Sequence, residues 1–443
     1  MARTFLPLTL VLAASGLAFS GTAVAQSSAP VAAPAATQAA DQDAKIRELE
    51  DRIIALENMV KELKAAQGQA AAVAPAGAPA AAPIQPAAAA QAAPAPAPME
   101  QPPPVQTGGA TSMAKALNPD ISVIGDFLGA AGRNPIAGVP SLQMHESEVG
   151  FQAIIDPYAR GDFFISFGEE GVNLEEGYIT FTALPGGIVA KVGKMRSAFG
   201  KVNTLHNHVL PWTDRPMVTD NLVGGEDGIN DAGFSVTRSF AGPKQLFLEG
   251  TAQVFRGDSA DVFTANRRSD VSVVGHFRGY KDITESTNLD LGFSYARGHN
   301  SIPYLTNMFG IDATARWKPL RRSIYHSFVG RSEFIWSDRG GLPSRFTNGE
   351  PTLGTQNAFG YYVSGDYQLA RRWFAGVRYD HTDRARNAAQ VDKGGSFVLT
   401  YWPSEFSQVR AQYRMANYAE GINANELRFQ VQFSLGAHGA HPF

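Results

Sequence analysis

The chain has 443 residues, of which 18% are charged and none is cysteine, and its formal net charge is −3. This composition would suit a soluble protein of two or three domains, and the lack of a basic excess gives no reason to expect a nucleic-acid partner. Beyond residue 25, no stretch reaches the roughly 18 consecutive apolar residues of a transmembrane helix. Any membrane-spanning structure must therefore be a closed β-barrel.

Residues 1–25 have the features of a secretory signal peptide. Arg3 precedes an apolar run over residues 5–19, and Ala23-Val24-Ala25 provides the pattern of small residues that signal peptidase requires at its cleavage site. The apolar run is too short for a membrane anchor. The lack of cysteine fits a chain that folds in the oxidising periplasm. We therefore expect export of the chain, with residues 26–42 as a short disordered segment after the cleavage site.

Residues 43–66 carry a heptad pattern that predicts a short coiled coil. The apolar a and d positions are occupied by Ile46, Leu49, Ile53, Leu56, Val60 and Leu63. A lone amphipathic helix is the alternative, but residues 67–117, which are rich in Ala, Pro and Gln, cannot bury a core for it to pack on. We expect this linker to be extended and to tether the coiled coil in the periplasm, where peptidoglycan is a candidate partner. The heptads leave open whether the coiled coil is dimeric or trimeric.

From Ile121 to the C-terminal Phe443, short alternating segments are joined by turns and long loops. In residues 426–435, every second residue is large and apolar and the others are charged or polar. Neighbours in a strand point to opposite faces, so one face can meet lipid and the other a wet interior. About sixteen such segments follow one another, an even number as bacterial barrels require. We therefore predict an all-β fold, a 16-stranded antiparallel transmembrane β-barrel over residues 118–443.

The connections between these segments alternate in length. Tight turns are predicted after the second, fourth, sixth, twelfth and fourteenth strands, whereas the long connections at residues 200–231, 257–270 and 338–357 follow odd-numbered strands. Outer-membrane barrels have short periplasmic turns and longer external loops. The pattern therefore places both ends of the barrel on the periplasmic side.

Four arginines near the end of the chain alternate with apolar residues. They are Arg378, Arg410, Arg414 and Arg428. Because their strand neighbours form the apolar face, these arginines are predicted to face water in the lumen. There they either attract anions or pair with an inward acid such as Asp380, and the sequence leaves both roles open.

The long connection after the fifth strand is predicted to fold into the lumen and to narrow it, as the corresponding loop of general porins does. It carries charges of both signs and apolar residues that can pack on the barrel wall. Its candidate selectivity residues are Lys201, His206, His208, Asp214, Arg215, Asp220, Glu226 and Asp227. Alternatively, His206 and His208 coordinate zinc together with nearby carboxylates, because imidazole and carboxylate are zinc ligands. Those carboxylates are Asp214, Glu226, Asp227 and Asp231, and a second candidate metal pair is His438 and His441.

Several of these features together resemble the phosphate-selective porin O/P family. They are the strand count, the short turns, the Gly193-Lys194-Met195-Arg196-Ser197-Ala198-Phe199-Gly200 segment before the long loop, and the closing Phe429-Gln430-Val431-Gln432-Phe433 strand. The resemblance covers roughly residues 121–435 and implies a trimer of sixteen-stranded barrels that pass anions across basic residues. The coiled coil and its arm resemble the N-terminal extensions of some sugar porins. The histidine-bearing loop and tail are similar to outer-membrane proteins labelled zinc-regulated.

The sequence contains no Walker loop, GxSxG, HExxH or spaced cysteine set, and we expect no enzymatic activity. We expect a porin of the Gram-negative outer membrane for passive diffusion of small hydrophilic solutes or ions, including anions such as phosphate. No cofactor is expected unless the histidines hold zinc. Two alternatives stay open, a zinc-binding or zinc-uptake protein and a structural envelope tether with a plugged barrel. The expected partners are outer-membrane lipid, lipopolysaccharide and further copies of the chain in a homotrimer.

Overall fold

The computed structural model describes residues 119–436, apart from residues 170, 260 and 348–349. The expected signal peptide (1–25), disordered segment (26–42), coiled coil (43–66) and linker (67–117) lie outside the described residues, as do His438 and His441. These expectations stay predictions. No helix in the described part of the chain has the length and hydropathy needed to cross a membrane.

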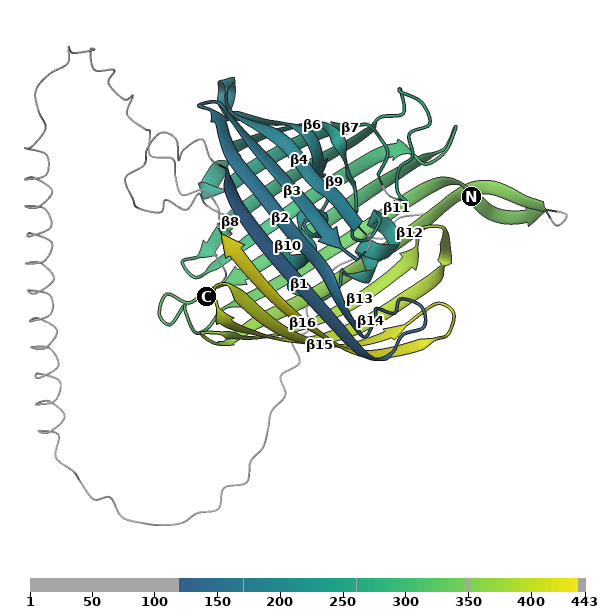
Figure 1. Cartoon of the computed structure of the whole chain (residues 1–443). Helices are drawn as coiled ribbons and strands as arrows, with labels where there is room; N and C mark the ends of the chain where they lie inside the picture. Colours follow the sequence, from purple (N-terminus) through teal and green to yellow (C-terminus); the bar gives the residue numbers. More distant parts are fainter. Residues whose placement is uncertain (1–118, 170, 260, 348–349, 437–443) are drawn as a thin grey trace, which may run out of the picture. The chain divides into compact units, whose positions relative to one another are not determined.

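Sixteen antiparallel strands form a closed barrel, which confirms the predicted fold (Figure 1). Each strand pairs with its neighbours in the sequence, and β1 closes the ring by pairing with β16. The strands are β1 (Asp120–Arg133), β2 (Leu142–Asp156), β3 (Ala159–Gly168), β4 (Gly171–Leu184), β5 (Ile188–Arg196), β6 (Asn230–Ala241), β7 (Phe247–Phe255), β8 (Ser272–Thr284), β9 (Thr287–His299), β10 (Leu305–Trp317), β11 (Phe328–Thr347), β12 (Glu350–Ala370), β13 (Trp373–Arg384), β14 (Asn387–Ser404), β15 (Ser407–Asn417) and β16 (Asn423–Gly436). Because the barrel is closed, the backbone polar groups of its wall have hydrogen-bond partners within the protein, as a hydrocarbon environment requires.

The alternation of side chains explains why this wall suits a membrane. On β15, Val409, Tyr413 and Met415 are exposed on the outer face, whereas Arg410 and Arg414 are buried on the inner face. Between Glu426 and Phe433 of β16, the outward-facing side chains are apolar as well, and the inward-facing ones are charged or amide-bearing. The outer face is therefore fit to contact lipid, and the inner face forms a polar lumen.

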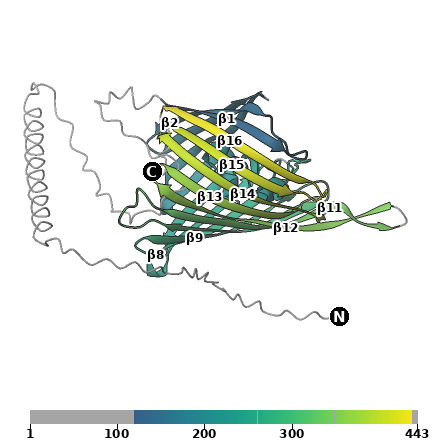
Figure 2. The same cartoon turned by 90° about the horizontal axis from the view of Figure 1, so that it is seen from below.

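The connections follow the predicted difference in length only in part, because tight turns also follow the odd-numbered strands β3 and β13 and a longer connection follows the even-numbered strand β10. Short turns follow β2, β4, β6, β12 and β14, and long connections follow β5 and β7. The expectation of a long loop at residues 338–357 is wrong, because β11 and β12 continue their pairing as far as Thr347 opposite Glu350. Figure 2 shows this hairpin projecting well beyond the neighbouring strands. Register shifts after Arg339 and after Pro343 interrupt the side-chain alternation there, although the two backbones stay paired.

The connection between β5 and β6, here called the lumen loop (residues 197–229), lies inside the barrel. It contains single helical turns at Val202–Thr204, Asn207–Val209 and Thr219–Val223. Its apolar side chains are buried against inward-facing side chains of β7 to β12 and of β14. The loop contributes Phe199, Val202, Leu210, Trp212, Val218, Leu222, Val223 and Ile229, and the wall contributes Phe255, Val274, Ala296, Met308, Ile335, Ala358, Tyr362 and Val398. Burial of this apolar surface holds the loop in the lumen.

Candidate channel constriction

Two buried polar side chains make the lumen loop a compact unit. Asn203 joins its two ends, because the Asn203 amide donates to the carbonyl oxygens of Ser197 and Ile229 at 3.0 and 3.1 Å. Asn203 Oδ1 also accepts from the backbone N–H of Ile229 at 2.9 Å. Arg215 donates to the carbonyl oxygen of Val202 at 3.0 Å. Burial lowers the pKa of Arg215 to about 10, so this predicted selectivity residue stays charged at neutral pH. Its guanidinium group bonds carbonyl oxygens of the lumen loop itself.

The beginning of the lumen loop is fixed to β9, β10 and β11. The backbone N–H groups of Lys201 and Val202 donate to the carboxylate of Glu333 at 2.8 and 2.7 Å. The ammonium group of Lys201 lies 2.9 Å from Asp290 and 3.4 Å from Asp312, both of which are buried. The structure thus places the charge of Lys201 against two carboxylates of the wall.

The middle of the lumen loop reaches β13 and β15 through Asp214. The carboxylate of Asp214 accepts a hydrogen bond from Arg378 at 2.9 Å and lies 3.2 Å from Nε of Arg414. Gln412 donates to the same carboxylate at 2.6 Å. Burial alone would raise the pKa of Asp214, but the nearby arginines, Arg378 first, outweigh burial and hold that pKa well below its usual range. Asp214 therefore stays ionised and ties the loop to the wall.

The four arginines that were expected to line the lumen lie on β13, β15 and β16 and are here called the arginine cluster. They are Arg378, Arg410, Arg414 and Arg428, and each is between 2% and 6% exposed. They lie on the inner face, but the expectation that they face water is wrong, because all four are buried. Arg378 and Arg410 bond the lumen loop, and Arg378, Arg414 and Arg428 pair with acids. Asp380 accepts from Arg378 at 2.8 Å, and Glu426 lies 3.3 Å from Arg414 and 3.1 Å from Arg428.

Arg410 differs from the other members of the arginine cluster. Its guanidinium group donates to the carbonyl oxygen of Trp212 at 3.0 Å, to Gln430 at 2.7 Å and to Thr400 at 3.2 Å. Among the described residues it has no carboxylate partner. The four guanidinium groups of the cluster share only the carboxylates of Asp214, Asp380 and Glu426. Asp126 and Asp366 act on Arg410 from beyond contact distance, so Arg410 is the guanidinium group of the cluster that has no carboxylate of the described residues in contact.

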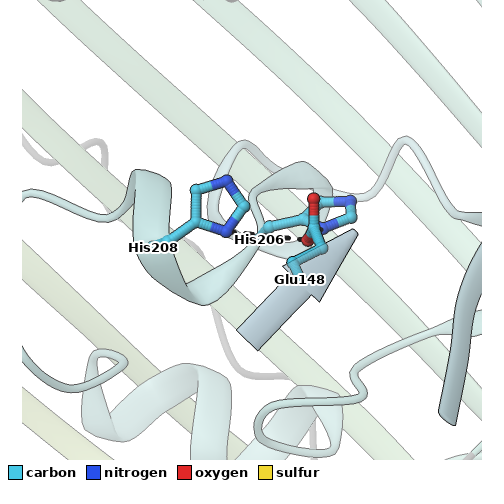
Figure 3. Close-up of side chains that lie close together, drawn as sticks. All are labelled: Glu148, His206 and His208. Atoms are coloured by element: carbon cyan, nitrogen blue, oxygen red, sulfur yellow. Dashed lines mark hydrogen bonds and ion pairs between the residues drawn. The ribbon is translucent and has the colours of Figure 1, made fainter. Parts of the chain in front are cut away.

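The two histidines of the lumen loop lie against β2 and β4 (Figure 3). Nδ1 of His206 lies 2.5 Å from Glu148 and 3.2 Å from Glu175, and Nε2 lies 2.8 Å from Glu176. Burial lowers the pKa of an imidazole, but Glu148 and Glu176 outweigh burial here and raise the pKa of His206 to about 10. His206 is therefore an imidazolium at neutral pH. Burial lowers the pKa of His208, whose Nδ1 lies 3.6 Å from Glu148, so this ring is neutral.

Two β-bulges concentrate titratable side chains at this place. In β4, a bulge at Glu175 lets the consecutive residues Glu175 and Glu176 both turn inward. In β2, a bulge at His145 has the same effect on His145 and Glu146, and Glu148 follows on the inner face. A bulge adds one residue to a strand and so re-aims a side chain that strict alternation would send to the other face.

The remaining predicted residues lie elsewhere on the lumen loop. Asp220, Glu226 and Asp227 are exposed, and Glu226 lies 3.1 Å from His145. The expectation that Asp214, Glu226, Asp227 and Asp231 complete a metal site with the histidines is wrong. The structure brings Glu146, Glu148, Glu175 and Glu176 to this place instead, and no spacing in the sequence marks these four carboxylates as ligands.

A scan against protein-family models finds none that matches the chain. A protein of Aquifex aeolicus (strain VF5), described as an uncharacterized protein, is 29% identical over 388 residues, which cover 74% of this chain and 81% of the relative. The anion-selective porin from Comamonas acidovorans is 10% identical with a TM-score of 0.50 and covers 72% of this chain and 99% of its own. The Salmonella typhi OmpF complex with daunomycin has the same identity and TM-score and covers 72% and 98%. The resemblance to the porin O/P family stays a prediction, and what these structures show is that the chain has the fold of the outer-membrane porins.

Proposed function

We propose that the protein is a porin through which small hydrophilic solutes diffuse passively, with the lumen loop as its constriction. The observation that carries this proposal is a closed sixteen-stranded barrel, apolar outside and polar inside, with a long loop folded into it. Barrels of this size enclose an aqueous channel, because the diameter grows with the number of strands. We place the protein in the outer membrane of a Gram-negative bacterium as a homotrimer, in contact with lipid and lipopolysaccharide.

Purified full-length protein should open ion-conducting channels in planar lipid bilayers. We expect stepwise increases in current whose size rises with salt concentration, because ions would cross a water-filled passage beside the lumen loop. The fold of each preparation is checked by its heat-dependent migration on a denaturing gel. A correctly folded protein that inserts and gives no current would contradict the porin and support the alternative of a plugged barrel that serves as an envelope tether.

We propose further that the channel prefers anions, of which phosphate is one. The arginine cluster supports this preference, because Arg410 lies beside the lumen loop with no carboxylate in contact in the part of the chain that the structure describes. Charged groups lining a pore set its selectivity by their local field rather than through the net charge of the whole protein. The porin from Comamonas acidovorans, whose barrel is similar, is described as anion-selective.

Replacing Arg410 by glutamine should lower the anion-to-cation permeability ratio several-fold, because the cluster then loses a positive charge. The ratio is obtained from the reversal potential in a salt gradient. The matched control is Arg238→Gln, which removes an arginine from an exposed position near the end of β6. This control should keep the reversal potential of the unaltered protein. Equal reversal potentials in Arg410→Gln and the unaltered protein would show that Arg410 does not set selectivity.

A further inference from the structure

We infer that the lumen contains a divalent-cation site formed by His206 and His208 of the lumen loop and by Glu148 of β2, with Glu146 and Glu175 beside it. The inference rests on the proposed function, because the ion would fix the loop that narrows the channel. Three independent observations support it, namely the arrangement of donor atoms, a buried carboxylate oxygen without an N–H or hydroxyl donor among the described residues, and an excess of negative charge.

The donor atoms of Glu148, His206 and His208 converge on one point. One ligand atom of each lies within 4.8 Å of the other two, and both rings turn a nitrogen toward the Glu148 carboxylate (Figure 3). Ligands bound tetrahedrally to zinc at about 2.0–2.2 Å lie roughly 3.5 Å apart. Nδ1 of His208 and the Glu148 carboxylate have this separation, 3.6 Å. A bound ion would take the place of the hydrogen that His206 and Glu148 share.

A second set of donor atoms meets the first at Glu148. Glu146, Glu148 and Glu175 each offer a carboxylate oxygen within 4.8 Å of the others. Glu146 is only 6% exposed, and its Oε1 accepts from no N–H or hydroxyl donor of the described residues. Its neighbour here is the carboxyl group of Glu175, which can bond it only through a shared proton. Nδ1 of His208 has no hydrogen-bond partner among the described residues. Buried polar atoms without a partner are costly and uncommon in folded proteins, and a cation would supply the missing contact.

The charge of the surrounding side chains also favours a cation. Five buried carboxylates gather here from β1, β2 and β4, namely Asp126, Glu146, Glu148, Glu175 and Glu176. The basic groups that contact them are Arg196, His145 and His206. With all five carboxylates ionised, as a bound metal ion requires, and both of these histidines protonated, the group carries two negative charges in excess. One divalent ion neutralises this excess, which is costly where the charges are buried and lack counter-ions.

The types of donor atom select the class of ion. Imidazole and carboxylate together suit zinc and related transition-metal ions, whereas magnesium and calcium prefer sites made of oxygen alone. The carboxylates belong to strands of the barrel wall, and the imidazoles belong to the lumen loop. A bound ion would therefore join the loop to the wall on the side of β2 and β4, in addition to the hydrogen bonds and ion pairs of His206.

Zinc binding can be measured by calorimetry on the folded full-length protein in detergent. His438 and His441 are replaced by alanine throughout, so that the tail cannot contribute. We expect one zinc ion per barrel in this background. His208→Ala and Glu148→Gln should each weaken binding by more than about 100-fold, since even the loss of an outer-shell partner weakens metal binding about 10- to 100-fold. The matched control is His276→Ala, which removes an inward-facing imidazole that bonds Ser294 on another part of the wall.

Absence of zinc binding in the background protein would overturn the site, as would binding that survives both His208→Ala and Glu148→Gln. Binding that is lost equally in His276→Ala would also overturn it, because the effect would then not depend on these ligands. Heat-dependent gel migration confirms that each variant is folded. The test is separate from that of the channel, because conductance is measured without zinc and zinc affinity is measured without a current.

Discussion

Replacing Asp214 by alanine should release the lumen loop from β13 and β15 and increase the single-channel conductance. The side chain of Arg378 is fully buried, that of Arg414 is 5% exposed, and Asp214 is the carboxylate that both share. Removing one partner of a buried ion pair costs about 3–5 kcal/mol, because the other charge stays buried and unpaired. A change of this size should shift the docking equilibrium of the loop by about 100-fold or more.

The measurement is the conductance and its fluctuation in planar bilayers, at a single salt concentration for all variants. Asp227→Ala is the matched control, because this loop carboxylate is exposed and only the backbone carbonyl of Asp227 contacts Arg196. It should behave like the unaltered protein. Asp214→Glu should restore part of the pairing and give an intermediate conductance. If Asp214→Ala conducts like Asp227→Ala, the loop does not depend on this ion pair for its position.

Replacing Trp212 by alanine should loosen the whole lumen loop while the barrel stays closed. Trp212 is 1% exposed, its ring meets Tyr362 edge-on with 5.3 Å between ring centres, and the guanidinium carbon of Arg378 lies 4.8 Å from the ring centre. Truncation of a buried tryptophan costs about 3–5 kcal/mol through lost burial and the cavity left behind. The apolar contact between the loop and the wall should therefore weaken severely.

Hydrogen exchange of the loop amides reports this change directly. Peptides from residues 197–229 should exchange about 100-fold faster in Trp212→Ala, because exchange follows the free energy of local opening. Peptides from the strands should keep their protection. Trp373→Ala is the control, since this tryptophan is 42% exposed and stacks on Tyr401 in the barrel wall. Unchanged exchange over residues 197–229 in Trp212→Ala would show that the apolar cluster does not hold the loop.

The strands could be predicted because side-chain alternation is a local signal. A wall between lipid and water needs it at every pair of neighbours, and residues 426–435 show it without interruption. The extension of β11 and β12 was missed because Gly340, Gly341 and Pro343 break the alternation. The hairpin continues there through pairing of the two backbones, which leaves no pattern in the side chains.

The partners of His206 could not be found by nearness in the sequence. Asp214 is close in the chain but reaches Arg378, whereas Glu148 is 58 positions away and lies at hydrogen-bond distance from His206. Where a loop meets a barrel wall depends on the finished fold. One signal was available, because strict alternation would have sent either Glu175 or Glu176 into lipid. That placement is unfavourable, and a bulge is the structural way to avoid it.

The contacts of the lumen loop determine the order in which the molecule can assemble. Thr213 bonds Gln412, which is 199 positions away, and Lys201 bonds Glu333, which is 132 positions away. Such distant contacts carry a large loop-closure entropy, and they cannot form until β11 and β15 are in place. We therefore expect docking of the loop to come late in folding, after β15 has joined the wall. Interactions that form after the rate-limiting step change the unfolding rate and leave the folding rate almost unaltered, so we expect the loop to set how long the folded state persists rather than how fast the barrel forms.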